Sequence, residues 1–150
     1  MNMKIEVIPT CSIAFIRHRG AYGEGNVETM EQLKHWAKDK NLMNSKSVIF
    51  GIAHDDPQTT LPENCRYDAC LLLADQRIPT NDTVQHGELF GGKYAVFTVE
   101  HTAEAVKQAW GEIFPVLSDN YLPDTTRPIL ERYAAEQVAQ HLCEICVPIR

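Results

Sequence analysis

Two stretches of the chain repeat apolar residues at the spacing of an α-helix. The first has an apolar residue at every third or fourth position, at Val27, Met30, Leu33 and Trp36/Ala37. Asn26 precedes this stretch and Asn41 follows it, and asparagine is favoured at both kinds of helix end. The pattern therefore predicts an amphipathic helix that Asn26 caps and Asn41 ends.

The second helical stretch lies in the other half of the chain. Its apolar residues stand at Val106, Trp110, Ile113 and Leu117. Thr102, followed by Glu104, is a start signal for a helix. Pro115 lacks a backbone N–H, so we expect it to kink this helix or to end its regular part near Phe114.

The other apolar segments are short and rich in β-branched or aromatic residues, which is typical of strands. They predict strands near Ile5–Ile8, Ser12–Arg19, Ser47–His54, Tyr67–Leu73, Thr83–Leu89, Lys93–Glu100, Pro128–Ala134 and Leu142–Ile149. Gly91 and Gly92 lie between two of these segments and predict a tight hairpin there.

The order of these elements repeats in the two halves, at about residues 4–75 and 80–150. Each half has a strand, a helix and two further strands, and the last strands align Asp68-x-Cys70 with Glu144-x-Cys146. Gly51 then falls opposite Glu131. The sequence predicts one α+β domain of two strand–helix–strand–strand units, with antiparallel sheet, both main helices on one face and a ligand groove on the other.

The composition excludes several classes of function. The 14 basic residues against 20 acidic ones give a net charge of −6, without a basic cluster, so we expect no direct nucleic-acid partner. No apolar run reaches the ~18–20 residues of a membrane span. The N-terminus lacks a signal-peptide core, and the five cysteines are an odd number. We expect a cytoplasmic protein without a disulfide framework.

Glu131 is the most informative single residue, because it interrupts an apolar strand between Leu130 and Arg132. It is either an exposed carboxylate on an edge strand or a carboxylate inside an aromatic-lined pocket. In the second case, removal from water would make its pairing with a cationic ligand strong and selective.

Four aromatic residues are candidates to line such a pocket: Trp110, Tyr133, Tyr67 and Phe50. A ring face attracts a cation by about 0.5–2 kcal/mol. Aromatic residues at helical or strand spacing also occur in ordinary cores, and for Trp110 the two interpretations are balanced. Trp36, on the first helix, is expected in the core.

The sequence favours neither a metal nor a cofactor. Cys143 and Cys146 have the spacing of half a zinc site, but residues three apart on a strand point to opposite faces. His54, Asp55 and Asp56 form the other candidate cluster, without partner ligands elsewhere. No nucleophile elbow, phosphate-binding glycine loop or zincin helix is present, so no catalytic residue is assigned.

Three stretches together resemble the GyrI-like effector-binding domains, which also occur at the C-terminus of AraC-type and MerR-type multidrug regulators of transcription. The first is Arg17–Glu24, at the first strand-to-helix turn, with Ala21 where proline is common. The second is Gly91–Phe97. The third comprises Trp110, the region 121–123 and Arg127–Tyr133. The likeness covers essentially all 150 residues.

This resemblance implies a duplicated strand–helix–strand–strand fold and a pocket for lipophilic, often cationic molecules with a central glutamate. Glu131 matches that glutamate through the Pro-x-x-Glu-x-Tyr pattern, whereas the aromatic lining is less fixed in the family. No helix-turn-helix precedes the first strand, so we expect a free-standing effector domain without a DNA-binding domain.

Three functions stay open from the sequence. The leading one is a binding module for bulky cationic or amphipathic compounds. The second is hydrolysis of reactive small molecules, as in some GyrI-like proteins, with Glu131 and either Tyr67 or Tyr133 as base and acid. The third is interaction with a protein, either DNA gyrase or a transcription regulator.

Overall fold

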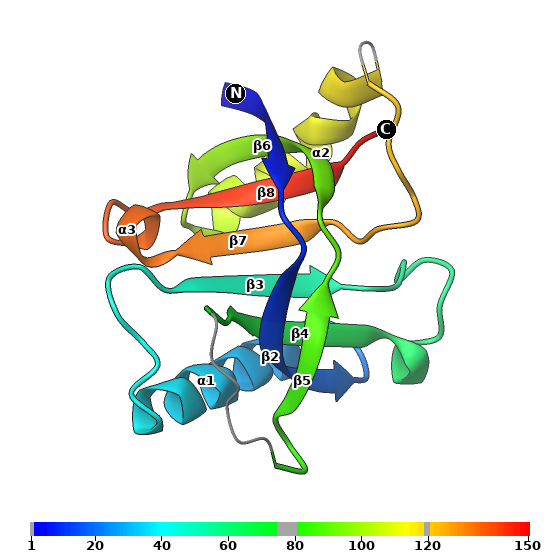
Figure 1. Cartoon of the computed structure of the whole chain (residues 1–150). Helices are drawn as coiled ribbons and strands as arrows, with labels where there is room; N and C mark the ends of the chain where they lie inside the picture. Colours follow the sequence, from blue (N-terminus) through cyan, green and yellow to red (C-terminus); the bar gives the residue numbers. More distant parts are fainter. Residues whose placement is uncertain (1, 75–80, 119–120) are drawn as a thin grey trace.

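The computed structural model describes residues 2–74, 81–118 and 121–150. Figure 1 shows one twisted sheet with two long helices, α1 (Glu24–Asp39) and α2 (Ala103–Ser118). The strands are β1 (Asn2–Ile8), β2 (Cys11–Arg19), β3 (Val48–Ala53), β4 (Arg66–Leu72), β5 (Gln85–Leu89), β6 (Gly92–Glu100), β7 (Leu130–Ala134) and β8 (Leu142–Pro148). A 3₁₀ turn at Pro62–Asn64 and the four-residue α3 (Ala135–Val138) complete the fold. Each predicted strand and helix is present, with ends shifted by a few residues.

The first helix begins earlier than its apolar pattern predicts. Gly23 is the N-cap, with φ of 134°, and its carbonyl accepts a bond from the N–H of Asn26 at 3.1 Å. The prediction that Asn26 caps α1 is therefore wrong, because glycine makes the turn one residue before Glu24. At the other end Asn41 is left-handed, with φ of 57°, and Leu42 donates to the carbonyl of Ala37 at 2.8 Å. Asn41 thus ends the helix as predicted.

The second helix starts as predicted and ends later. The hydroxyl of Thr102 accepts a hydrogen bond from the N–H of Ala105 at 3.1 Å, which caps the first turn. The helix continues through Pro115 to Ser118, so of the two effects expected from Pro115, an end of the helix near Phe114 is wrong. Ile113 and Leu117 are fully buried against the sheet, and this burial holds the last turn in helical form despite the proline.

The sheet is antiparallel and has the strand order β1-β6-β8-β7-β3-β4-β2-β5. The units β2-α1-β3-β4 and β6-α2-β7-β8 pair through β3 and β7 at its centre. In that pairing Gly51 stands directly opposite Glu131. The two positions that align between the repeats therefore meet on the pseudo-twofold axis.

A two-stranded ribbon crosses from one unit to the other. β1 pairs with β6, and β2, which continues β1, pairs with β5, which precedes β6 (Figure 1). The predicted hairpin at Gly91 and Gly92 is therefore wrong, because β5 and β6 do not pair with each other. A Cβ on Gly91 would lie 2.1 Å from the carbonyl oxygen of Ile8, so this glycine allows the two strands of the ribbon to pass closely.

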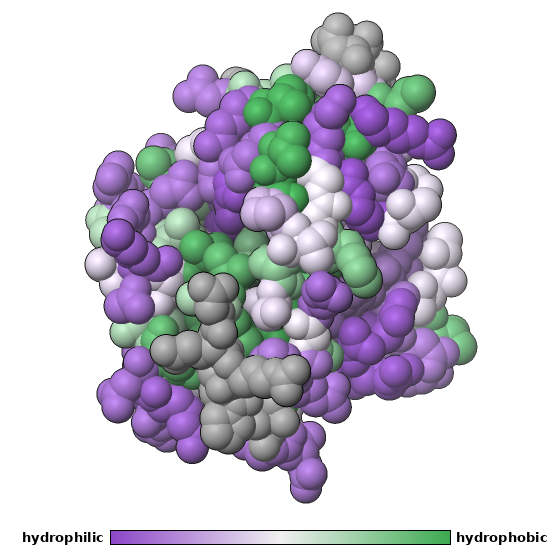
Figure 2. Space-filling view, viewed as in Figure 1, coloured by the Kyte–Doolittle hydropathy of each residue, from purple (hydrophilic) through white to green (hydrophobic). Residues whose placement is uncertain are grey.

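Three clusters of buried side chains form the core. In one cluster, the ribbon residues Ile13 and Tyr94 pack against residues of the central strands such as Phe50. Residues on the other side of the sheet pack under α1, around Leu33, and under α2, around Ile113. Seen from the ribbon side, the surface is mainly hydrophilic with scattered hydrophobic residues (Figure 2). The face of the central strands that lies opposite the helices is thus covered by the ribbon and filled with buried side chains.

Candidate ligand-binding site between the two helices

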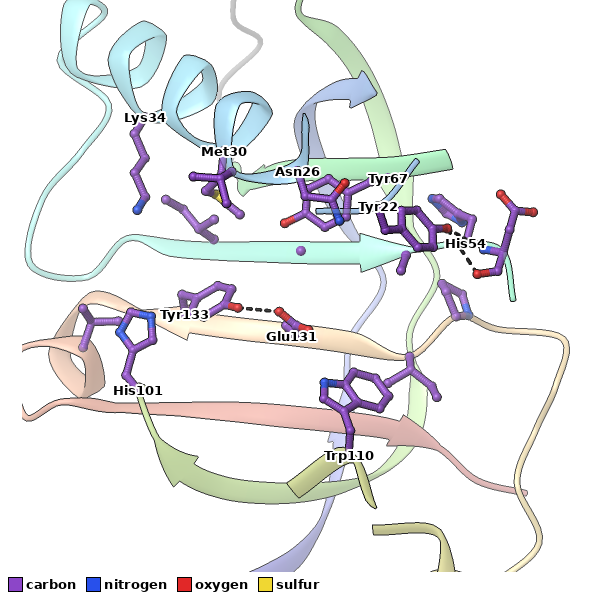
Figure 3. A pocket seen from close by; sticks show the side chains of 18 of the residues that line it. Tyr22, Asn26, Met30, Lys34, His54, Tyr67, His101, Trp110, Glu131 and Tyr133 are labelled. Atoms are coloured by element: carbon purple, nitrogen blue, oxygen red, sulfur yellow. Dashed lines mark hydrogen bonds between the residues drawn. The ribbon is translucent and has the colours of Figure 1, made fainter. Parts of the chain in front are cut away.

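A cavity of about 1560 Å³ opens between α1 and α2 over the central strands β3 and β7. α1 contributes Met30 and Lys34, α2 contributes Trp110 and Phe114, and the floor includes Glu131 (Figure 3). The predicted α+β class and the two helices are confirmed, but the groove lies on the helix face and not on the opposite one. The reason is that the ribbon folds over that opposite face and fills it. The volume exceeds the ~300–1,000 Å³ of most ligand pockets.

Glu131 lies at the middle of the cavity floor. β7 is paired on both sides, with β8 and β3, so the interpretation of an exposed carboxylate on an edge strand is wrong. Oε2 of Glu131 accepts a hydrogen bond from the hydroxyl of Tyr133 (Figure 3). Burial, together with the charge of Glu131, raises the pKa of Tyr133, so Tyr133 stays a protonated donor to this carboxylate.

Tyr67 reaches the same place from the first unit. It is 8% exposed, and a Cβ built on Gly51 would lie only 2.6 Å from its hydroxyl oxygen. Burial and then the charge of Glu131 raise the pKa of Tyr67. The absence of a side chain at Gly51 thus makes room for a second tyrosine hydroxyl beside the carboxylate.

The other predicted aromatic residues divide between cavity and core. Trp110 is half-buried and lines the cavity from α2. Phe50 is 2% exposed and packs beneath the ribbon, so its prediction as a ligand-binding residue is wrong. Its side chain points away from the cavity because strand residues alternate in direction, and its neighbours Ile49 and Gly51 line the cavity instead. Trp36 packs on the core under α1, as expected.

Sequence reasoning missed residues at both ends of the cavity. At one end Tyr22, from the glycine-rich turn before α1, donates from its hydroxyl to the carbonyl of Arg66 at 2.8 Å and accepts from the N–H of Asp55 at 3.0 Å. At the other end the His101 ring lies 5.2 Å from that of Tyr133, centroid to centroid. Aligning the halves would have paired Tyr22 with His101, since each lies two residues before the start of a long helix.

An ion pair holds the Tyr22 end of the cavity wall. Arg66 donates to Asp55 from Nη2 at 2.9 Å and from Nε at 3.0 Å. These bonds lower the pKa of Asp55 to about 2. Asp55 is therefore held as a carboxylate by Arg66.

The cysteine candidates for a metal site do not converge. Cys143 packs under α2, whereas Cys146 packs beneath the ribbon, as the strand alternation predicts. Within residues 2–74, 81–118 and 121–150, no three His, Cys, Asp or Glu side chains gather in a metal-binding group. The cysteines are all free thiols.

The sequence matches the model of the GyrI-like small-molecule binding domain over residues 1–150. The chain therefore belongs to this family. It is 43% identical, over 100% of both chains, to the SPbeta prophage-derived protein YosT of Bacillus subtilis (strain 168), which is named as a candidate transcriptional regulator. It is 27% identical to a DNA gyrase inhibitor of Pantoea sp. (strain At-9b), over 89% of this chain and 88% of that one.

Solved structures share the fold at low sequence identity. The C-terminal domain of EcmrR superposes with a TM-score of 0.75 at 14% identity and covers 99% of this chain and 97% of that one. SAV2435, solved bound to tetraphenylphosphonium, gives a TM-score of 0.61 at 13% identity over 100% and 94%. A hydrolase from Listeria innocua gives 0.64 at 9% identity over 99% and 91%.

In the described part of the chain, none of the helices has the length and apolar character needed to cross a bilayer.

Proposed function

We propose that the domain binds bulky lipophilic cations in the cavity between α1 and α2, and that Glu131 supplies the charge that selects them. The observation that carries this proposal is the position of the Glu131 carboxylate, on the floor of a large cavity beside Tyr133 and Tyr67. Apolar walls reduce the screening of that charge by water, which strengthens its attraction for a cation. The neighbour solved with tetraphenylphosphonium supports the same class of ligand.

The aromatic wall adds to this preference. Trp110 faces the cavity from α2, and an aromatic ring face attracts cations. A lipophilic cation would bury its hydrocarbon surface against Met30 and Phe114 while its charge lies over Glu131. Membership in a family of small-molecule binding domains supports binding rather than a purely structural role for the cavity.

Titration calorimetry with tetraphenylphosphonium tests the proposal. Glu131→Gln keeps the size of the side chain and removes its charge, so we expect its affinity to fall at least tenfold, which is about 1.4 kcal/mol. Glu88→Gln is the matched control, because Glu88 is exposed on β5 and does not line the cavity. Triphenylphosphine oxide, an uncharged relative of the ligand, should bind both variants and the wild type alike. Equal affinity of wild type and Glu131→Gln for the cation would refute the role of Glu131.

A second candidate function is hydrolysis of an electrophilic ligand. The hydrogen bond from Tyr133 to Glu131 favours it, since a carboxylate could activate water while the Tyr67 hydroxyl donates to the leaving oxygen. Incubation with trans-stilbene oxide, followed by mass spectrometry, distinguishes the two functions. Binding alone returns the epoxide unchanged, whereas hydrolysis yields a diol and stops in Glu131→Gln.

A further inference from the structure

The charged side chains of the cavity are not spread evenly along it. Three of them are paired with residues outside the cavity lining: Asp55 with Arg66, His54 with Asp68, and Arg127 with Asp124. Glu131 remains at the middle of the floor. Lys34 and His101 lie toward the same end of the view in Figure 3, on the Tyr133 side, whereas Tyr22 and His54 lie toward the other end. The cavity therefore has a carboxylate at its centre, and at one end it has two basic side chains, with the exposed Glu31 beside Lys34.

Lys34 is poorly neutralised within the protein. The nearest carboxylate to its Nζ is Glu31, at 3.9 Å, one turn away on the same helix. Glu31 has a side chain that is 69% exposed, so this contact contributes little. The amine points from α1 into the cavity (Figure 3), where it is free to take a second, anionic partner.

His101 is placed by its own contacts to face the same end. Its ring lies 5.2 Å from the Tyr133 ring, and its backbone N–H donates to the carbonyl of His141 at 2.8 Å. The ring thus lines the cavity and can donate an N–H to an oxygen. Lys34 from α1 and His101 from the loop before α2 offer donors from opposite walls.

We infer that the preferred ligand is an amphoteric molecule, with a lipophilic cationic part over Glu131 and a carboxylate or similar anion at the Lys34–His101 end. This inference rests on the proposed function, because the cationic part uses the same site. It adds a requirement that a simple lipophilic cation does not meet. Lys34 then selects ligands that carry an anionic group, and Glu131 selects ligands whose central part is cationic.

Tetramethylrhodamine and its methyl ester form a matched pair of probes. The acid is a zwitterion and the ester is a cation of nearly the same shape. We expect the wild type to bind the acid about fivefold more tightly than the ester in calorimetry, since one partly exposed ion pair is worth up to about 1 kcal/mol. Lys34→Met should abolish this preference, so that the acid and the ester bind the variant with equal affinity.

Lys38→Met is the control variant, because Lys38 is exposed on the same helix and does not line the cavity. It should keep the preference for the acid. The inference fails if the wild type binds the acid no more tightly than the ester, or if Lys34→Met still prefers the acid. In either case the proposed function stands as long as the ester binds and its affinity depends on Glu131. If the wild type binds neither dye, both fail.

Discussion

The two strand–helix–strand–strand units have the same plan but different residues at the seam where they meet. At the axis the first unit has Gly51 and the second has Glu131. Two glutamates facing each other there would repel, since like charges directly opposite in a sheet are destabilising. Because the first unit has a glycine there, only the Glu131 carboxylate lies on the axis. The same glycine makes room for Tyr67. The comparison teaches that asymmetry at one position creates the site.

The units differ also in how they neutralise an aligned buried acid. Asp68 in the first unit pairs with Arg17 at 2.7 Å and with His54 at 2.8 Å. Glu144 in the second unit pairs with Arg132 at 2.8 Å, and Arg132 also holds Glu6 of β1 at 2.8 Å. The first acid has two close partners, whereas the second depends mainly on one arginine, with Lys4 at 3.7 Å.

The largest effect is expected from Arg132→Met. Removing this guanidinium leaves Glu144, whose side chain is 3% exposed, without its main counter-ion, and breaking a buried pair in this way costs about 3–5 kcal/mol. Arg17→Met should cost clearly less, because Asp68 keeps His54. Denaturation in guanidinium chloride measures both, with the exposed Arg19→Met as control. Equal losses for Arg132→Met and Arg17→Met would show that the two acids are neutralised alike.

An intermediate effect is expected from Gly51→Ala. The new methyl group would meet the Tyr67 hydroxyl at 2.6 Å, and overpacking of this kind costs about 1–3 kcal/mol. In the Tyr67→Phe background the same change should cost less, because the oxygen is gone. A double-mutant cycle from thermal or chemical denaturation gives this coupling.

Gly111→Ala is the control for Gly51→Ala in the second unit. Nothing lies within 4 Å of a Cβ at Gly111, so this helical substitution should stabilise the protein by about 0.5–1 kcal/mol. If Gly51→Ala costs the same with and without the Tyr67 hydroxyl, the close approach of Tyr67 does not explain the glycine.

The smallest effect concerns acid sensitivity of the first unit. Arg66 holds the pKa of Asp55 at about 2, below its ordinary value of 3.8. A lowered carboxyl pKa stabilises the fold above the unfolded value and loses that contribution as pH falls from about 4 toward about 2. The midpoint of denaturation should therefore fall less between these two pH values in Asp55→Asn than in the wild type.

Asp82→Asn is the control for the acid experiment, because Asp82 is an exposed residue that no described ion pair contains. It should keep the acid sensitivity of the wild type. An unchanged pH profile in Asp55→Asn would mean that the Arg66 pair contributes nothing to it.

The pattern of the sequence predicted the elements and the second-unit glutamate, because both depend on local spacing and on the repeat. Strand alternation separated Cys143 from Cys146 correctly. It also puts Phe50 and Gly51 on opposite faces, but it does not say which face a helix covers and which the ribbon covers. That choice depends on pairing between distant strands. The same pairing explains why Gly91 and Gly92, which look like a hairpin in the sequence, do not form one. Lys34 and His101 carry no motif, so only the folded chain brings them to the cavity.

The crossing ribbon has a consequence for how the chain folds. Asn2 pairs with Thr98, so the first strand of the chain cannot complete its ladder until β6, the first strand of the second unit, exists. Pairings between such distant segments slow folding. During synthesis, β1 would emerge early and wait with unpaired backbone groups, which exposes it to wrong pairing until β6 is made.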